Sequence, residues 1–413
     1  MKFKLTALEK KWVLYDIGNS AFIMLCTTII PIYFNYLAEL QNLSSVDYLA
    51  YWGYASSIIT LIVVFLGPVL GAVADQKNRK KLLFLITILV GAAGCIALGF
   101  ARTWILFLII FILAKVGCST SLIFYDSMLT DITTEERMDS VSSSGYAWGY
   151  IGSCIPFAAC LVLVLGYESF GLTMSGSMAA AFLITAVWWV VCGLPIYRNY
   201  KQIHYVEKKK GALTSAFTQL WHSLKEISRD KRILFFLLAF FCYIDGVYTI
   251  IDMATAYGSA LGLDSTGLLL ALLVTQIVAF PSTILFGRLA RKFDATKLIP
   301  VCIVSYMGVV IFAFFMTTQT QFWILAVWVG MFQGGVQSLS RSYFAKIIPP
   351  EKSSEYFGIL DICGKGASFL GTTLIGIISQ ATDSVNNGIL VLIVLFIIGL
   401  FLFLKAAKYN KTA

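Results

Sequence analysis

The sequence contains few charged residues for its length. Only 13% of its 413 residues are Asp, Glu, Lys or Arg, whereas 59% are hydrophobic. A water-soluble domain of this size requires a much larger share of polar residues to cover its surface. The composition therefore excludes a soluble globular protein and predicts an integral membrane protein.

Patterns for metals, disulfides and nucleotides are also missing. The only two histidines, His204 and His222, fall in one polar stretch, and none of the nine cysteines forms a CxxC pair. The ATP-binding pattern GxxxxGK[ST] does not occur, which argues against primary pumping. We therefore expect no metal, no cofactor and no disulfide framework. The net charge of +9 does not indicate nucleic-acid binding either, because the basic residues cluster between apolar runs.

Long apolar runs are abundant, and about 20 apolar residues suffice to cross a bilayer. Twelve runs qualify: 12–40, 48–74, 82–100, 103–128, 142–166, 173–196, 233–257, 265–287, 298–317, 321–344, 357–379 and 388–404. The polar stretch 197–232 divides them into six and six. We predict an all-α membrane protein with two six-helix bundles, residues 1–196 and 233–413, and a central cavity between them.

The polar stretch itself contains a helical pattern. Apolar residues recur at spacings of three and four, at Phe217, Leu220, Trp221, Leu224 and Ile227. This spacing predicts an amphipathic helix. Two interpretations stand: the helix lies on the membrane surface, or it packs on the protein's own cytoplasmic face.

The distribution of Lys and Arg predicts the orientation in the membrane. If the N-terminus is cytoplasmic, the inner segments hold 27 of these residues, and the outer ones hold Arg102 alone. Cytoplasmic loops carry such an excess of positive charge. We therefore expect both termini in the cytoplasm.

Two loops repeat at one offset. Gly71 opens a loop that contains Asp75 and Arg79, and Gly287 opens a similar loop 216 residues later. Glu135 and Glu351 end two further short loops that are also 216 residues apart. A constant offset indicates that the chain consists of two homologous halves.

The loop after the second run resembles the G-x-L-A-D-x-x-G-R-[RK] loop of the major facilitator superfamily. It matches at Gly71, Ala74, Asp75, Arg79 and Lys80, and departs at Asn78, where glycine is usual. Asparagine tolerates the left-handed backbone conformation, so the departure is mild. Three further stretches narrow the resemblance to the vacuole-effluxer branch: YDIGNSAF (15–22), YIDGVYTII (243–251) and GGVQSLSRSYFAKIIPPEKSSEYFG (334–358). The resemblance implies a secondary transporter whose two bundles rock against each other. The chain lacks the long loops of fungal members, which favours a bacterial cytoplasmic membrane.

Two acids within the seventh run are the leading candidates for function. Asp245 lies near the middle of the membrane, where an ionisable group costs about 3 kcal/mol to insert. Asp252 follows seven residues later, so both carboxyl groups lie on one helical face. We expect this face, with the neighbouring Tyr243 and Tyr248, to line a polar cavity.

Charged and polar residues in the first and fourth runs extend this site. Lys115 lies near mid-membrane and is a natural partner for Asp245 or Asp252; alternatively, an acid of its own bundle neutralises it. Asp16 and Asn19 lie on one polar face. Asp16 either faces the cavity or is an interfacial acid at a helix N-terminus.

The tenth run carries Gln333, Gln337 and Arg341 at spacings of four. Such a stripe is suited to binding a carboxylate. Alternatively, Arg341 belongs to an inner gate or contacts lipid headgroups. We assign Asp126 and Asp131 to an inner gate at the cytoplasmic end. Gly71, Asp75 and Arg79, which belong to the loop motif after the second run, are assigned to the same gate.

These residues predict a transporter, not an enzyme. We expect it to move a small polar or zwitterionic, amino-acid-like solute by alternating access. A buried carboxyl group favours its protonated form and a nearby lysine favours the charged form, so proton coupling is expected, with Na⁺ as an alternative. The remaining expected partner is membrane lipid, and we expect a monomer.

Two other functions stay open at this point. A lipid or lysolipid transporter can be built on the same fold. An intramembrane aspartyl protease requires two acids on facing helices and a GxGD motif, whereas Asp245 and Asp252 share one helix and the motif is missing.

Overall fold

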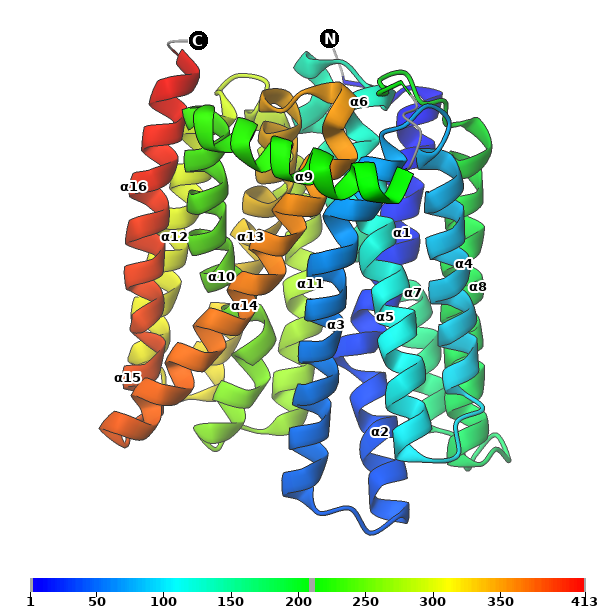
Figure 1. The fold of residues 1–413 in the computed structure, drawn as a ribbon. Helices are drawn as coiled ribbons and strands as arrows, with labels where there is room; N and C mark the ends of the chain where they lie inside the picture. The colour runs from blue at the N-terminus through cyan, green and yellow to red at the C-terminus, as the bar shows by residue number, and fades with distance from the viewer. Residues whose placement is uncertain (1–2, 208–211, 412–413) are drawn as a thin grey trace.

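The computed structural model describes residues 3–207 and 212–411 as an all-helical chain. In this part of the chain, the only β pairing is an isolated bridge between Gln76 and Val206. Figure 1 shows the long helices side by side, with both chain ends at one end of the molecule. We call that end the termini end and the other the opposite end. The prediction of an all-α membrane fold is confirmed.

The first bundle contains the N-terminal helices. Its elements are α1 (Ala7–Thr27), α2 (Ile29–Leu40), α3 (Ser45–Ala74), α4 (Lys80–Leu98), α5 (Trp104–Ser127), α6 (Leu129–Ile132), α7 (Glu135–Leu165) and α8 (Met174–Asn199). The connecting stretch contains α9 (Ala212–Arg229), which lies across the long helices near the termini end (Figure 1).

The second bundle contains the C-terminal helices. Its elements are α10 (Lys231–Ala260), α11 (Ser265–Leu289), α12 (Ala295–Phe314), α13 (Gln319–Ile347), the 3₁₀ turn η1 (Pro350–Lys352), α14 (Ser353–Thr382), α15 (Val385–Ile389) and α16 (Val391–Lys411). The assignment of 1–196 and 233–413 as separate domains, with 197–232 as linker, stays a prediction.

Among the described residues, eleven segments are long and apolar enough to cross a bilayer, the first of them formed by α1 and α2 together. Within α14, the described residues give a shorter apolar stretch, Leu370–Thr382. The outer surface is apolar as well: Phe65, Leu165 and Phe401 are each more than half exposed. Side chains of this kind are suited to contact with lipid chains, and the predicted twelve-helix arrangement agrees with these elements.

Proline explains one departure from the predicted runs. The first run, 12–40, is interrupted at Thr28, between α1 and α2. Pro31 has no N–H to donate, and its ring crowds the carbonyl four residues earlier. The Thr28 hydroxyl instead donates to the Met24 carbonyl at 2.6 Å. The first crossing is therefore a bent pair of helices.

Polar packing explains a second departure. The fifth run was predicted to begin at residue 142, but α7 begins at Glu135. Residues 135–144 are mostly polar, so a hydropathy pattern does not include them. Several of them are nevertheless buried, because this end of α7 packs against the second bundle. The helix is stabilised there by protein contacts and not by lipid.

Two helix junctions join the bundles, and they are related by the internal repeat. α14 packs on α3, and α7 packs on α11. A Cβ on Gly71 of α3 would lie 2.4 Å from the Ser354 carbonyl oxygen, and one on Gly287 of α11 would lie 2.7 Å from the Ser143 Cβ. Glycine thus allows close helix approach at both junctions.

Candidate functional site

Arg341 on α13 joins the two bundles at the termini end. Its Nη1 donates to Asp126 Oδ1 at 2.9 Å, and its Nη2 donates to Asp16 Oδ2 at 3.2 Å. Its Nε donates to the Ser142 hydroxyl, also at 2.9 Å. Asp16, Asp126 and Ser142 come from α1, α5 and α7, so one guanidinium binds three helices of the other bundle.

Aromatic rings enclose the same guanidinium. Its central carbon lies 4.2 Å from the ring centre of Tyr146 and 4.6 Å from that of Trp12. A cation held against aromatic faces gains additional electrostatic attraction, which is stronger away from water. The side chain of Arg341 is buried, so both its charge and its planar surface are satisfied by the first bundle.

This geometry differs from the stripe predicted for α13. The guanidinium of Arg341 is occupied by protein acids, Gln337 is half-buried, and Gln333 is buried inside the second bundle. The three side chains therefore do not form one carboxylate-binding surface. Spacings of four place residues on one helical stripe, but a stripe that turns slowly around the helix meets different neighbours along its length.

Asp75 forms a second connection between the bundles. Its carboxyl oxygens accept the backbone N–H groups of Ser354 and Glu355, both at 2.9 Å. These are among the free N–H groups of the first turn of α14, where an acid is favoured. Burial raises the pKa of Asp75, whereas Lys80 and the two N–H groups lower it. Lys80 is fully buried and donates to the Ser353 hydroxyl at 2.8 Å.

Asp131 lies apart from the Arg341 cluster. Its Oδ1 accepts the His204 backbone N–H at 2.9 Å, and its Oδ2 lies 3.8 Å from Lys80 Nζ. Tyr200 also donates its hydroxyl to this carboxylate. Asp131 thus fixes the start of the connecting stretch to the first bundle, and it does not link the bundles as the predicted gate assignment implied.

Arg79 and Asn78 lie in the loop between α3 and α4. Arg79 is half-buried and forms no ion pair with the described residues. Asn78 has φ of 63°, so the expected left-handed backbone at this position is confirmed. This conformation turns the chain from α3 into α4.

Serines complete the contact between the bundles, and the sequence analysis did not identify them. The Ser142 hydroxyl donates to the Ser338 carbonyl at 2.7 Å, and Ser127 and Ser354 share a hydrogen bond of 2.9 Å. Ser140 donates to the Gly287 carbonyl at 3.0 Å. The only available signal was the clustering of small hydroxyl residues near the ends of apolar runs.

The hydrogen bonds identified between the two bundles lie toward the termini end. They involve the ends of α3, α5, α11 and α13 and the beginnings of α4, α7 and α14, together with Asp16 of α1. A dense set of polar contacts therefore joins the two bundles at this end.

Asp245 is buried within the second bundle. Its Oδ1 accepts the Gly371 backbone N–H at 3.0 Å and the Thr249 hydroxyl at 3.3 Å. Its Oδ2 is buried and has no hydrogen-bond partner. The side chain has no exposed surface and no cation within 4.0 Å among the described residues. This is an acid without a counter-charge at mid-helix.

Asp252 has a different environment, although it lies on the same face of α10. Its side chain is exposed and forms no hydrogen bond or ion pair with any residue that the structure describes. Lys115 on α5 of the other bundle is half-buried and likewise forms neither. The two charges are close enough to interact electrostatically, but they are not in contact. The predicted shared cavity for Asp245 and Asp252 is thus divided into a buried and an exposed acid.

The other predicted residues serve local contacts. Asn19 donates to the Tyr15 carbonyl at 3.1 Å and to Asp16 Oδ1 at 3.3 Å. The Tyr243 hydroxyl shares a hydrogen bond of 2.6 Å with Ser340 within the second bundle. Tyr248 is half-buried and has no hydrogen bond to a described residue. Of these, only Tyr248 has a polar group free to meet a ligand.

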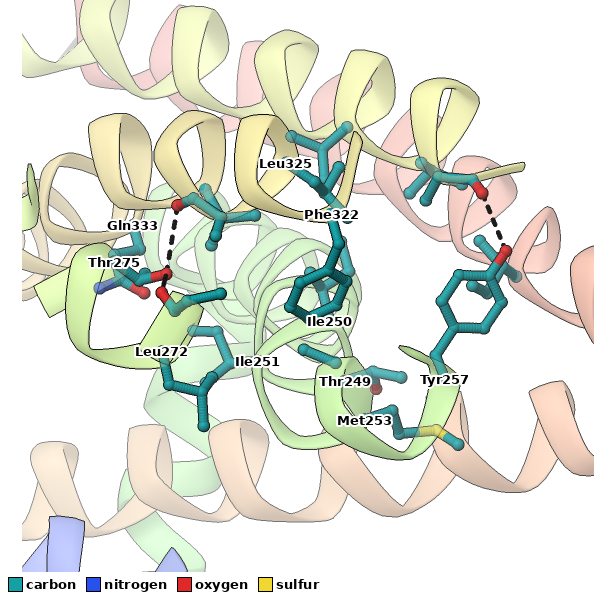
Figure 2. A pocket seen from close by; sticks show the side chains of 18 of the residues that line it. Thr249, Ile250, Ile251, Met253, Tyr257, Leu272, Thr275, Phe322, Leu325 and Gln333 are labelled. Carbon is teal, nitrogen blue, oxygen red and sulfur yellow. Dashed lines mark hydrogen bonds between the residues drawn. The ribbon is translucent and has the colours of Figure 1, made fainter. Parts of the chain in front are cut away.

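An apolar pocket lies inside the second bundle, between α10, α11, α12 and α13 (Figure 2). Thr249, Met253, Thr275 and Gln333 are among its lining residues. The Gln333 Nε2 is buried and has no hydrogen-bond partner. The pocket therefore offers mostly apolar surface and one unpaired amide donor. Within the part of the chain that the structure describes, no cluster of His, Cys, Asp or Glu is suited to a metal ion.

Residues 42–411 match the model of a protein family described as vacuole effluxer Atg22 like. An uncharacterized MFS-type transporter of Bacillus subtilis, YxiO, is 40% identical over 417 residues, which cover all of this chain and 97% of that protein. Autophagy-related protein 22 of Cryptococcus neoformans is 27% identical, and the match covers 66% of this chain and 50% of the fungal protein.

Solved structures confirm the architecture. The major facilitator transporter FucP in the outward conformation matches with a TM-score of 0.73 at 14% identity, covering 98% of this chain and 97% of that one. A bacterial homologue of the iron transporter ferroportin, in an outward-facing state, matches with a TM-score of 0.67 at 14% identity, covering 99% and 100%. At these identities the likeness establishes the fold alone.

Proposed function

The chain belongs to the Atg22-like vacuole effluxer family of MFS-type transporters, and we propose that it moves a small polar or zwitterionic, amino-acid-like solute coupled to protons. The solute would bind between the bundles, and access would alternate between the two ends. No catalytic step is part of this proposal.

The unpaired charges of Lys115 and Asp252 carry the proposal. One is a cation on the first bundle, the other an anion on the second, and neither has a hydrogen-bond or ion-pair partner among the described residues. Unpaired charges within a membrane protein are costly and mark binding sites by default. A zwitterion placed between them would direct its carboxylate at Lys115 and its ammonium group at Asp252. Both ends of one solute would then be satisfied.

Asp245 is the proposed proton carrier. A buried carboxylate with no counter-charge is unfavourable, and binding of a proton removes the charge. Its free Oδ2 is the atom that would hold this proton. Because Gly371 and Thr249 bind the other oxygen, movement of α14 relative to α10 would change the affinity for the proton. Such a link between helix position and protonation is what coupling requires. Na⁺ at the same carboxylate is the alternative to a proton.

The proposed orientation follows from the basic residues. With both termini in the cytoplasm of a bacterial cell, the polar contacts around Arg341 and Asp75 close the cytoplasmic end. The chain would then be in an outward-facing arrangement, in agreement with the states named for FucP and the ferroportin homologue. The protein would function as a monomer in the cytoplasmic membrane.

Thermal unfolding with a panel of solutes tests the substrate class. A ligand at 100 times its Kd stabilises the native state by about 2.7 kcal/mol. We expect stabilisation by zwitterionic amino acids and none by their amides or decarboxylated amines. Lys115→Gln and Asp252→Asn should each abolish it while leaving the unliganded protein stable. Stabilisation that survives in both variants would contradict the assignment of these two residues.

Proton coupling is tested in vesicles with an imposed pH gradient. Asp245→Asn should bind the solute as the wild type does but transport it without response to the gradient. Gradient-driven accumulation by this variant would remove Asp245 from the coupling mechanism. Replacing the pH gradient by a Na⁺ gradient distinguishes the two coupling ions.

A transporter of lysolipids or other amphiphiles is the second candidate. The apolar pocket in the second bundle favours it, because an acyl chain requires apolar surface (Figure 2). Stabilisation by lysolipids, but not by amino acids, would support this candidate. Gln333→Leu should then change the lysolipid response, whereas Lys115→Gln should not.

A further inference from the structure

We propose that α9 docks on an anionic lipid surface through its outward face, which consists of Trp221, Leu224, Lys225, Ser228 and Arg229. The helix has two unlike faces, and only one of them packs on the protein. The proposal does not depend on the transported solute. It rests on three observations about the residues of α9 that the structure describes.

The inward face attaches α9 to both bundles. Leu220 packs on Val69 and Ala72 of α3, and Ile227 is almost fully buried. Glu226 forms an ion pair of 2.6 Å with Lys352, at the start of the second bundle's α14. These contacts hold α9 across the long helices near the termini end, as Figure 1 shows.

The outward face is apolar at its centre. Trp221 is 71% exposed and Leu224 is 43% exposed. At 100° per residue, Trp221 and Ser228 lie on the side of the helix away from Ser223 and Ile227, which are both buried, and Leu224 lies at the edge between the two sides. No described residue covers more than a small part of Trp221. A tryptophan in this position is typical of the membrane–water interface, where its ring lies among the headgroups.

Two positively charged side chains lie beside this apolar centre, and they favour lipids with negatively charged headgroups. Lys225 and Arg229 are exposed, one helical turn apart, and both lie beside Trp221 on the same side of it. The acid nearest to this face, Glu226, is already paired with Lys352. A helix that lies across the bundles near their end, with a tryptophan beside two cations, fits the boundary between acyl chains and negatively charged headgroups. Zwitterionic headgroups carry no net negative charge, so they attract the two cations more weakly.

Quenching of tryptophan fluorescence tests the docking. The full-length protein is placed in vesicles of phosphatidylcholine alone or with phosphatidylglycerol, and the acyl chains are brominated near the headgroup or near their ends. The contribution of Trp221 is the difference between the wild type and Trp221→Phe. We expect it to be quenched by the shallow bromines, more strongly when phosphatidylglycerol is present, and weakly by the deep ones.

Charge variants sharpen the test. Each cation near an anionic surface contributes about fivefold in binding, so Lys225→Gln with Arg229→Gln should remove most of the phosphatidylglycerol effect. Lys292→Gln with Lys297→Gln is the matched control, because it removes the same charge at the same end of the molecule but outside α9. Equal quenching of wild type and Trp221→Phe overturns the proposal. So does a loss in the control variant as large as in the α9 variant.

None of these measurements uses a solute. A failure of α9 to dock therefore leaves the proposed transport untouched, and a failure of transport leaves the docking result valid.

Discussion

Charged side chains at the boundary between the bundles are paired at the termini end, whereas two charged side chains elsewhere are unpaired among the described residues. At the termini end, hydrogen bonds of 2.9–3.3 Å cross the boundary between the bundles; they involve Arg341, Asp16, Asp126 and Asp75. Elsewhere, Lys115 of the first bundle and Asp252 of the second form no ion pair with a described residue. Buried charges whose hydrogen bonds and ion pairs are all made to the other bundle stabilise the contact between the bundles. An unpaired charge is available to bind a ligand. The difference separates residues that hold the two bundles together from residues that we propose to recognise a solute.

The largest effect is expected from Arg341→Ala. Removing this guanidinium leaves the buried Asp16 and the half-buried Asp126 without a counter-charge, which costs about 3–5 kcal/mol. We expect a large fall in thermal stability and entry of water-soluble cysteine reagents from the termini end. Arg341→Lys restores the charge but not the three-way hydrogen bonding, so it should recover only part of the loss. If Arg341→Ala is as stable as the wild type and excludes the reagents, contacts other than those of Arg341 hold the termini end closed.

A smaller effect is expected from Gly71→Ala. The new Cβ would lie 2.4 Å from the Ser354 backbone oxygen, so α3 and α14 would have to separate. Overpacking of this kind costs about 1–3 kcal/mol. Gly287→Ala meets a serine side chain at 2.7 Å and should cost less. Thermal unfolding of the pair measures the difference between the two junctions.

Gly53→Ala provides the control for these glycine variants. A Cβ at this position in α3 meets nothing within 4 Å, so the change should be neutral or slightly stabilising. Equal losses in Gly53→Ala and Gly71→Ala would contradict the steric explanation.

A still smaller effect is expected from the titration of Asp75. Burial raises the pKa of this carboxyl group in the closed junction, against the influence of Lys80. Its contribution to stability is therefore fully present below the ordinary pKa of an aspartate and is lost as the pH rises through the raised value. Asp75→Asn should flatten this part of the stability profile. The measurement is thermal unfolding across the acidic pH range, and an unchanged profile would exclude Asp75 as its source.

The smallest effect on stability is expected from Lys115→Met. Because Lys115 has no hydrogen-bond or ion-pair partner in the part of the chain that the structure describes, the free energy of unfolding should change by no more than about 0.5 kcal/mol. Transport should nevertheless be lost. A stability loss similar to that of Arg341→Ala would show that Lys115 belongs to a structural pair, and the contrast between the two regions would fail.

Much of the fold could be predicted from the sequence because a bilayer imposes a simple length rule on apolar runs. The twelve-helix arrangement and the vacuole-effluxer relationship were both recovered. The loop around Asn78 was also predictable, because backbone conformation there depends on one residue type. The beginning of α7 could not be predicted in the same way, because its polar residues 135–141 are stabilised by contacts with the other bundle.

The sequence predicted which residues belong to the candidate site, but not which residues they contact. Asp245, Asp252, Lys115 and Arg341 were identified because charge is rare in apolar runs. Their partners were not, because pairing between bundles joins residues that are hundreds of positions apart. Arg341 illustrates this: three equally spaced polar side chains suggested one surface, yet its partner Asp16 lies 325 residues away. The different exposure of Asp245 and Asp252 likewise depends on where α14 crosses α10.

The contact between Asp75 and the start of α14 has a consequence for biosynthesis. The acid that satisfies the first N–H groups of this helix is made 279 residues before Ser354. This junction can therefore form only after most of the chain has been made. Until α14 joins the first bundle, Asp75 and Lys80 lack the partners that α14 provides. An N-terminal bundle produced alone would display this unfinished surface to chaperones and proteases.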